Sequence, residues 1–341
     1  MRLLVITHSL DRNGAAVCLV DLLLHLRQQG WSIDVLHGGE GPFVPELHAV
    51  GIRTLNRLNR HQYDVALINT VLDARWISSL EPHLPCLLWA HEGRVVLPPG
   101  TPSVAAWRTM LTQASKLVFQ TAWQAHEVLG DHLDTLRPNQ LALVPNGLPE
   151  WALAPLDTTR TSQPTIAWTG VICPRKRPGD MAKAVLQLTD IGAVCQFTGN
   201  ASFMRLLPAS DRDLFARHPG PLQLLGETSR QGSVERVAAA HVFCLPSEDE
   251  SFPLSCLEAA AQARPLVLTA LPCYQGIWQH GVNALLSPVG DVQALARHLR
   301  MVLIDTALAV RLGAAARQTA LRHTQAAQHL HMLKILHAIA P

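Results

Sequence analysis

The sequence is poor in charge and in aromatic residues. Charged residues make up 16% of the 341 residues and aromatic residues 5%, and the formal net charge is only +2. This balance gives no support to nucleic acid as the main partner. Hydrophobic residues reach 48%, so long disordered segments are excluded. The length predicts two domains, or one large one, with well-filled cores.

Long apolar runs are also missing. Stretches such as Leu3–Thr7 and Pro85–Ala90 are far shorter than the roughly 20 residues that a membrane span requires. The first is too short for the apolar part of a signal peptide, and Asp11 and Arg12 follow it closely. We therefore expect a cytoplasmic protein, with peripheral contact at the inner face of the membrane left open.

The cysteines form no CxxC pair. Their number is odd and they are widely spread: Cys18, Cys86, Cys173, Cys195, Cys244, Cys256 and Cys273. Zinc sites and thioredoxin-like redox sites are therefore disfavoured. Reduced thiols in apolar surroundings are the expectation.

Short β-rich runs alternate with helical stretches along the whole chain. The expected strands are 3–7, 32–36, 65–69, 86–90, 117–120, 141–144, 166–169, 194–198, 222–225, 242–245 and 266–269, and the helices include 15–29, 233–240, 254–263 and most of the chain from 292. Such alternation predicts parallel sheets covered on both faces. Residues 149–164 are rich in proline and threonine and predict a linker.

The fold class expected is therefore α/β, with two doubly wound, Rossmann-like domains facing across a cleft. The first domain is assigned residues 1–150 and the second 151–341, with the C-terminal helices allowed to return to the first. In such domains ligands bind beyond the carboxyl ends of the strands.

The stretch from residue 292 onward is basic. It has one acid, Asp305, against six basic residues: Arg297, Arg300, Arg311, Arg317, Arg322 and Lys334. Either a solvated helix face or contact with an anionic surface such as a membrane fits this excess.

The segment that follows the expected strand 242–245 has the strongest functional pattern. An acidic loop ending in Glu250 precedes a helix for which Ser251 is the expected N-cap, with Pro253 in its first turn. The unpaired N–H groups at such a helix start suit a pyrophosphate. Glu250 and Glu258 offer carboxylates for sugar and ribose hydroxyls, although two solvated glutamates near a helix start fit as well.

Three further features lie just after expected strands. Gly170 is followed by the basic trio Arg175, Lys176 and Arg177, which fits a phosphate site or a solvated turn. Asn13-Gly14 lets a ligand approach a helix start or forms an ordinary turn, and it is not the GxGxxG of dinucleotide sites. His91 follows strand 86–90, where a functional and a structural histidine are both possible.

Together these residues resemble the family 4 glycosyltransferases, retaining enzymes of the GT-B fold. The likeness is densest over 242–291, where Glu250 and Glu258 match the family's E-x7-E motif. Gly170 with Lys176 is similar to its donor-phosphate element, Asn146-Gly147 to its "PNG", and Gly14 to its N-terminal glycine loop. The likeness covers nearly the whole chain and is weak over 30–115. It implies that the first domain, 1–150, is the acceptor side and the second domain, 151–341, the nucleotide-sugar donor side.

The resemblance implies a role for each matching residue. Glu250, His91 and Lys176 are the implied catalytic groups, with Glu250 on the transferred sugar, His91 near it and Lys176 on the phosphates. The other implied donor-binding residues are Gly14, Gly170, Arg175, Arg177, Leu254, Ser255 and Glu258, with the amides of Leu254 and Ser255 on the distal phosphate and Glu258 on the ribose. No metal and no cofactor is implied, because cations and the helix start stabilise the leaving diphosphate.

The sequence departs from the family at Val171, where arginine is usual after the glycine of the phosphate element. Either Arg175 or Arg177 substitutes for it, or phosphate binding is weakened. Pro253 and Ala263 stand where glycine is common, and Asn13 where the glycine loop often begins with glycine.

The expected function is transfer of a sugar from a UDP-, GDP- or ADP-linked donor to a glycan, lipid-linked or small-molecule acceptor, in glycan or glycoconjugate biosynthesis. Two alternatives remain open at this point: a sugar-nucleotide 2-epimerase of the same fold, and a non-catalytic sugar-binding relative. Neither a nucleic-acid partner nor a particular acceptor is indicated.

Overall fold

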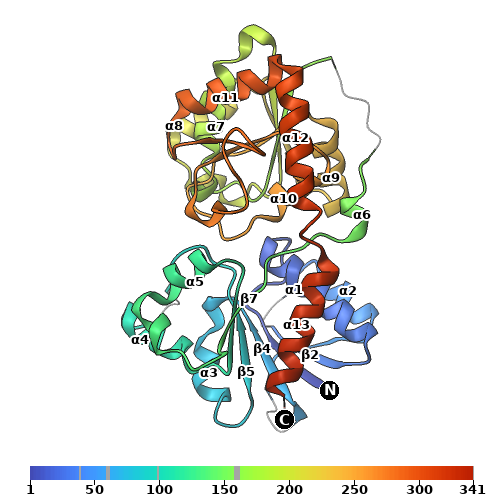
Figure 1. The fold of residues 1–341 in the computed structure, drawn as a ribbon, viewed down its shortest axis with the longest axis vertical. Coiled ribbons are helices and arrows are strands. Elements are labelled where there is room, and N and C mark those ends of the chain that lie inside the picture. Colours follow the sequence, from blue (N-terminus) through green and yellow to red (C-terminus); the bar gives the residue numbers. More distant parts are fainter. Residues whose placement is uncertain (38–39, 59–61, 98–99, 157–161, 341) are drawn as a thin grey trace. The chain divides into compact units, whose positions relative to one another are not determined.

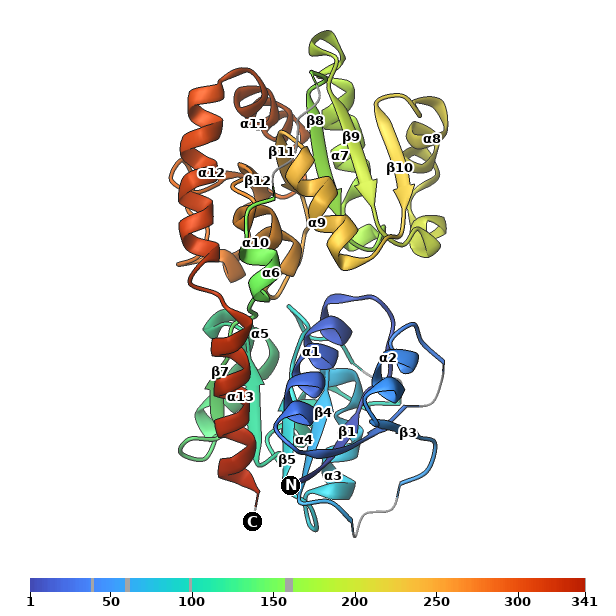
Figure 2. The same ribbon diagram turned by 90° about the vertical axis from the view of Figure 1, so that its right-hand side faces the viewer.

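The structure, a computed structural model, describes residues 1–37, 40–58, 62–97, 100–156 and 162–340. The chain forms two compact units (Figures 1 and 2). Unit 1 consists of Met1–Asn146 and Ala326–Pro341, and unit 2 of Gly147–Gln325. The expected boundary at residue 150 therefore falls just inside unit 2, and the last helix belongs to unit 1.

Unit 1 is built on a parallel sheet. Within the described residues it has seven strands in the order β3-β2-β1-β4-β5-β6-β7. They are β1 (Arg2–Ile6), β2 (Ser32–Leu36), β3 (Arg53–Leu55), β4 (Val65–Asn69), β5 (Cys86–Trp89), β6 (Lys116–Phe119) and β7 (Leu141–Leu143). Only β3 was not expected from the sequence, because three partly exposed residues carry no readable apolar pattern.

Capping side chains mark the start of three helices of unit 1. Its described α-helices are α1 (Gly14–Gln28), α2 (Val44–Ala49), α3 (Arg75–Leu80), α4 (Val104–Leu111), α5 (Ala122–Leu129) and α13 (Gln325–Ile339). The side chains of Asn13, Ser103 and Thr121 accept N–H groups of the first turns of α1, α4 and α5. A hydroxyl or amide cap therefore fixes the start of each of these three helices.

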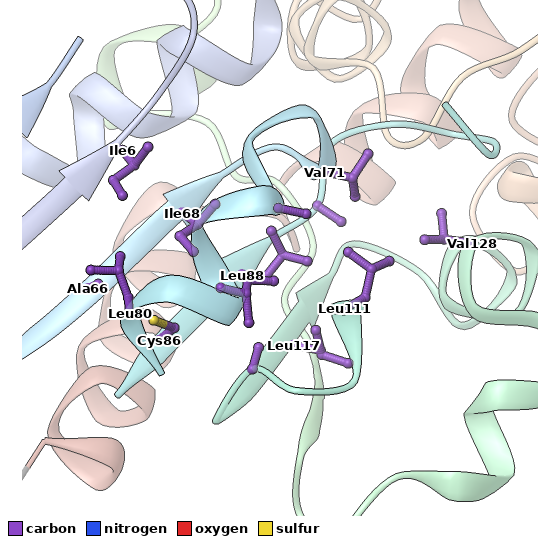
Figure 3. Close-up of a cluster of buried hydrophobic side chains, with 14 of the residues drawn as sticks. Ile6, Ala66, Ile68, Val71, Leu80, Cys86, Leu88, Leu111, Leu117 and Val128 are labelled. Carbon is purple, nitrogen blue, oxygen red and sulfur yellow. The ribbon is translucent and has the colours of Figure 1, made fainter. Parts of the chain in front are cut away.

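A buried apolar cluster fixes α3, α4 and α5 on one face of the sheet (Figure 3). Alternate residues of the strands supply one side of it, for example Ile68 and Leu88. Ile77 of α3, Leu111 of α4 and Val128 of α5 supply the other side. Each is fully buried, so the strands are held rigidly below the loops that follow them.

Helix α13 packs in unit 1 although it follows all of unit 2 in the chain (Figure 1). Its buried residues are Gln328, His329, Met332, Ile335 and Leu336. The His329 ring lies 4.9 Å from that of His25 on α1, and His337 meets Trp31 edge to face. Burial lowers the pKa of His329 to about 4, so this ring is neutral in the packed helix.

Unit 2 repeats the plan of unit 1. Its described sheet has six parallel strands in the order β10-β9-β8-β11-β12-β13. They are β8 (Thr165–Thr169), β9 (Val194–Thr198), β10 (Leu222–Gly226), β11 (Val242–Leu245), β12 (Leu266–Thr269) and β13 (Leu285–Ser287). The short β13 was not expected, for the same reason as β3.

Seven α-helices of unit 2 lie in the described residues. They are α6 (Glu150–Leu153), α7 (Pro178–Leu186), α8 (Ala209–Arg217), α9 (Arg230–Ala239), α10 (Leu254–Ala261), α11 (Val292–Ile304) and α12 (Thr306–Ala320). The expected linker 149–164 contains α6, whose Ala152 is buried, and its residues 157–161 lie outside the described residues. Both sheets and their helices confirm the predicted fold class of two parallel α/β domains.

The strand order places a switch point in each sheet. In unit 1, β1 lies between β2 and β4, and in unit 2, β8 lies between β9 and β11. In each sheet, the chain connections on the two sides of this point therefore run in opposite directions. This opens a crevice at the carboxyl ends of β1 and β4 in unit 1, and of β8 and β11 in unit 2. These two crevices are the expected places for ligands.

The two segments in which the chain passes from one unit to the other are hydrogen-bonded to each other. The N–H of Leu148 donates to the carbonyl of His323 at 2.9 Å, and the N–H of Gln325 donates to the carbonyl of Leu148 at 2.8 Å. A Cβ at Gly147 would lie 2.3 Å from the backbone of Thr324. Glycine is needed in Asn146-Gly147 because only a residue without a side chain lets the two segments come this close.

Several arginines of the basic C-terminal stretch are bound to the protein itself. Arg300 forms a bidentate pair with Asp190 at 2.7 Å, and Arg311 and Arg317 donate to the carbonyls of Gly281 and Ala261. Of these three, only Arg300 is paired with an acidic side chain of the described residues. Among the described residues no helix has the length and apolar character needed to cross a membrane.

The cysteines behave as the sequence predicts. All seven lie in described residues, and the structure shows no disulfide among them. All except Cys173 are buried. Their role is therefore packing in the apolar core.

Candidate functional site

The start of α10 lies at the carboxyl end of β11, beside the switch point of unit 2. The predicted cap Ser251 is wrong: Pro253 occupies the N-cap position, and no side chain caps the helix. Ser251 precedes the helix by too many residues for its hydroxyl to reach the amides of the first turn. The N–H groups of Leu254 and Ser255 therefore have no partner in the helix and no side-chain cap, as an anion site requires.

Glu250 is buried in the loop before this helix. It is 6% exposed. Its Oε1 accepts hydrogen bonds from Lys176 Nζ at 2.5 Å and from Ser247 Oγ at 2.7 Å. Arg175 Nη1 lies 3.3 Å from the same oxygen. The structure thus brings together four residues from the loops after β8 and β11, and two of them, Lys176 and Glu250, were predicted as catalytic.

The charges around Glu250 set its ionisation. Burial alone would raise its pKa, but Lys176 and Arg175 outweigh that effect and hold the pKa of Glu250 below the ordinary value. Burial would likewise lower the pKa of Arg175, and the carboxylate of Glu250 raises it instead. Glu250 and Arg175 are therefore both charged near neutral pH.

Arg175 and Arg177 point to different partners. The Arg175 guanidinium donates to the carbonyl of Asp249 and lies beside Glu250. Arg177 has a left-handed backbone and binds Asp180 at 2.5 Å and Glu248 at 3.2 Å. Of the two arginines that were expected to replace the one missing at Val171, Arg175 is the one placed at the buried cluster.

Gly170 and Lys176 lie against each other. Gly170 has φ of +149°, and a Cβ built on it would lie 3.5 Å from Cε of Lys176. A Cβ on the neighbouring Gly199 would overlap the carbonyl of Gly170. These glycines let the loops after β8 and β9 pack tightly, so that the lysine lies across the end of the sheet.

Glu258 lies one turn inside α10 and is buried. Its Oε1 accepts a hydrogen bond from Arg230 Nε at 2.7 Å. The guanidinium of Arg230 also lies 5.7 Å from the centre of the Trp151 ring, a cation–π distance. Arg230 could not be predicted from the sequence, because nothing in its neighbourhood marks it as the partner of a residue 28 positions away.

In unit 1, Gly14 is the first residue of α1, just after β1. A Cβ at this position would meet no atom of the described chain within 4 Å. The protein's own packing therefore does not require glycine here, and the space beside it is open. This fits a position at which a ligand approaches the helix start.

His91 follows β5 and is anchored on both ring nitrogens. Its Nε2 lies 2.9 Å from Oδ1 of Asn69, and its Nδ1 lies 3.4 Å from Nε2 of Gln120. Burial lowers the pKa of His91 to about 3. The ring is therefore neutral, and its function is hydrogen bonding rather than charge stabilisation.

A second polar cluster in unit 1 escaped the sequence analysis. His8 follows β1 and contacts Thr70 and Asp73, which follow β4. Glu92, beside His91, accepts the N–H groups of Val71 and His91. The position of His8 directly after a predicted strand was a sequence signal that could have indicated this cluster. Its partners could not be read from the sequence, because they lie more than 60 residues away in the chain.

Comparison with known proteins bears on this geometry. Residues 216–319 match the family described as "Glycosyl transferases group 1", a segment that contains Arg230, Glu250 and Glu258. No curated protein matches the chain.

Solved structures match the whole fold. Anabaena HepE in complex with UDP and glucose has a TM-score of 0.81 and 18% identity, over 98% of this chain and 99% of that chain. Sucrose-phosphate synthase of Thermosynechococcus elongatus has a TM-score of 0.82 and 18% identity, over 98% of both chains. A glycosyltransferase from Rickettsia africae has a TM-score of 0.79 and 14% identity, over 99% of this chain and 98% of that chain.

These findings confirm two predictions. The fold is GT-B, since the structural likeness extends over both units. The chain is a glycosyltransferase, as the family match within unit 2 indicates. The roles of the single site residues are not tested by these comparisons and stay predictions.

Proposed function

We propose that the chain transfers a sugar from a nucleotide-linked donor to a hydroxyl acceptor, with retention of the anomeric configuration, as in the family 4 glycosyltransferases. The observation that carries the proposal is the buried cluster of Lys176, Arg175 and Glu250 beside the uncapped start of α10. This cluster lies at the switch point of unit 2, where such sheets bind nucleotides.

The donor's diphosphate fits the positive part of this cluster. The N–H groups of Leu254 and Ser255 would hold the distal phosphate, and Lys176 and Arg175 the phosphate that leaves with the nucleotide. Lys176 is neutralised by Glu250 in the ligand-free chain. A bound phosphate would take over the lysine and leave the Glu250 carboxylate to accept hydrogen bonds from sugar hydroxyls.

The remaining donor contacts are those that the resemblance to the family 4 glycosyltransferases implies. Glu258 would accept the ribose hydroxyls once Arg230 releases one of its oxygens, and Gly14 leaves room for the phosphates at the start of α1. His91, whose neutral ring is oriented by Asn69 and Gln120, would lie near the donor sugar. Among the solved relatives, Anabaena HepE is described with UDP-glucose, so a UDP-linked hexose is the first donor to test.

The chemistry needs neither a metal ion nor a basic side chain. The bond between the anomeric carbon and the phosphate oxygen breaks as the acceptor oxygen bonds to that carbon on the same face. The acceptor's proton passes to the departing phosphate, whose charge Lys176, Arg175 and the helix amides stabilise. A glycan, a lipid-linked glycan or a small molecule would serve as acceptor, placing the enzyme in cytoplasmic glycan biosynthesis.

The direct test is a donor screen by thermal unfolding. UDP-, GDP- and ADP-linked sugars are added to the purified protein, and donor turnover is followed by isomer-resolving mass spectrometry. A donor at 100 times its dissociation constant should add about 2.7 kcal/mol of stability. A protein that neither binds nor consumes any of these sugars would refute the proposal, and an isomerised donor would assign an epimerase instead.

Arg175 and Arg177 give a matched pair of variants for the phosphate site. Arg175→Ala should lower kcat/KM for the donor about tenfold or more, since a hydrogen bond to a charged group contributes about 1.5–3 kcal/mol. Arg177→Ala removes the same group from the same loop, but its partners are Asp180 and Glu248. Equal losses of turnover in the two variants would remove Arg175 from the site.

A further inference from the structure

Ser247 is a fully buried hydroxyl residue at the cluster around Glu250. It directly follows Pro246 after the end of β11 and is 0% exposed. Its Oγ donates to Oε1 of Glu250 at 2.7 Å. A buried hydroxyl requires an acceptor, which a backbone carbonyl could supply. Here the acceptor is instead the carboxylate that is expected to bind the transferred sugar.

The donors around Glu250 all meet at one of its two oxygens. Oε1 receives Lys176 Nζ at 2.5 Å and Ser247 Oγ at 2.7 Å, and Arg175 Nη1 lies 3.3 Å from it. Among the described residues, none forms a hydrogen bond or an ion pair with Oε2. An ionised carboxylate accepts through both of its oxygens. Oε2 is therefore the oxygen that can receive a hydroxyl of a bound sugar.

A bound donor would change the contacts at Oε1. In the proposed function the diphosphate of the donor draws both Lys176 and Arg175, because it has more charge and more acceptor oxygens than a single carboxylate. The serine hydroxyl cannot follow them, since Ser247 is fully buried and uncharged. Ser247 is then the donor that remains at Oε1 of Glu250.

The sheet holds the backbone of Ser247 in place. Its carbonyl accepts a hydrogen bond from Oγ1 of Thr269, a buried residue at the end of β12. Strands β11 and β12 pair in parallel up to Leu245 and Leu268, so this contact continues the pairing beyond the end of β11. The hydroxyl of Ser247 therefore has a fixed origin, three residues before the carboxylate that it contacts.

We propose that Ser247 is a positioning residue for the transfer reaction. Its hydroxyl holds Oε1 of Glu250 while the phosphates of the donor draw the two cations away, and Oε2 thus stays available to the sugar. The inference rests on the proposed function, because only a bound donor removes the cations from Glu250. Hydrogen bonds to an ionised acceptor are short and strong, so a single hydroxyl suffices. Ser247 acts through Glu250 and is not itself a catalytic residue.

Ser247→Ala removes this hydroxyl and leaves both cations and Glu250 in place. With UDP-glucose as the probe donor, kcat for donor consumption should fall about tenfold, as expected for one lost hydrogen bond to a charged group. The dissociation constant of UDP, which has the phosphates but no sugar, should stay unchanged. Ser247→Thr keeps a hydroxyl at this position and should recover most of the lost kcat.

Ser287→Ala is the matched control. Ser287 is also fully buried in unit 2, and its Oγ lies 2.8 Å from Nδ1 of His298. Both alanine variants therefore lose one buried hydrogen bond and should lose similar stability. Only Ser247→Ala should lose kcat. An unchanged kcat in Ser247→Ala, or equal losses of kcat in the two variants, would overturn the positioning role.

A second measurement needs no donor. Lys176→Met removes the lysine permanently, as a bound phosphate would do for the duration of one turnover. Ser247→Ala should then lower the unfolding midpoint more in the Lys176→Met background than in the wild type, because fewer donors hold the carboxylate. Equal shifts in the two backgrounds would contradict the proposal. Unequal shifts in a protein that ignores every nucleotide-sugar would refute the proposed function and confirm the contact between Ser247 and Glu250.

Discussion

Lys176 and Glu250 lie on different loops of unit 2 and neutralise each other inside the protein. Removal of Lys176 takes away the nearer of the two cations at Glu250 and leaves only Arg175, at 3.3 Å, and loss of one partner of a buried ion pair costs up to about 3–5 kcal/mol of stability. Replacement of both partners by neutral groups costs much less. The structural and the catalytic contributions of the pair can therefore be separated by measuring stability and turnover of the same variants.

Lys176→Met should lower the free energy of unfolding by about 3–5 kcal/mol and abolish donor turnover. The double variant Lys176→Met/Glu250→Gln should regain most of this stability without regaining turnover, because the cation for the leaving phosphate is still missing. Chemical unfolding at neutral pH and donor consumption are the two measurements. Recovery of turnover in the double variant would contradict the proposed role of Lys176.

The pH dependence of the same pair has a defined sign. The pKa of Glu250 is lower in the folded chain than its ordinary value, so its contribution to stability is complete above the unfolded pKa. That contribution is lost as the pH falls through the folded pKa. The difference in unfolding free energy between wild type and Glu250→Gln should therefore shrink on acidification, which unfolding curves at a series of acidic pH values would reveal.

His8 titrates in the opposite sense. The hydrogen bond to Asp73 raises its pKa, although burial lowers it, and the other acids add to the rise. Its stabilising contribution is present below the unfolded pKa and is lost as the pH rises through the folded pKa.

At the scale of elements, buried parallel strands were readable from the sequence because both of their faces are apolar. The runs at β1, β4, β5, β8, β11 and β12 were located to within a residue. The strands β3 and β13 were missed because three residues hold no periodicity. Ser251 was misassigned as a cap because capping residues are also common in loops.

The candidate site was readable only in part. The residues after the strands were found, since the carboxyl ends of parallel strands collect ligands. The pairings of Glu258 with Arg230 and of His8 with Asp73 were not, because they are set by tertiary packing between distant segments. No local pattern carries that information.

Substitution of Gly147 tests how closely this residue packs against Thr324, in the other segment that connects the units. Gly147→Ala would place a methyl group 2.3 Å from the backbone of Thr324, and backbone cannot move aside as the end of a side chain can. We expect a loss of about 2 kcal/mol or more. Gly220→Ala, where the added carbon meets nothing within 4 Å, should change stability by less than about 0.5 kcal/mol. Thermal unfolding of both variants would decide, and equal effects would contradict the crowding.

At the scale of the whole molecule, unit 1 consists of two separate segments of the chain, and unit 2 of the segment between them. Helix α13 completes unit 1 after unit 2 has been traversed. The sequence left this return open, because the periodicity of a helix does not show which sheet it covers.

Substitutions of two leucines in α13 measure how much this helix contributes to the stability of unit 1. Leu336 is fully buried and Leu330 is 51% exposed. Leu336→Ala should destabilise unit 1 by about 2–5 kcal/mol, whereas Leu330→Ala should have an effect below about 0.5 kcal/mol. Hydrogen exchange should show faster opening of amides in β1 and α1 and unchanged exchange in β11. Equal loss of protection in both units would contradict the assignment of α13 to unit 1.

The return of α13 has a consequence for synthesis. Unit 2 is continuous in the chain, so it can finish folding as soon as it leaves the ribosome. Unit 1 emerges first, yet the face of its sheet that receives α13 stays uncovered until every residue of unit 2 has been made. The half of the protein that is translated first is therefore the last to complete its core.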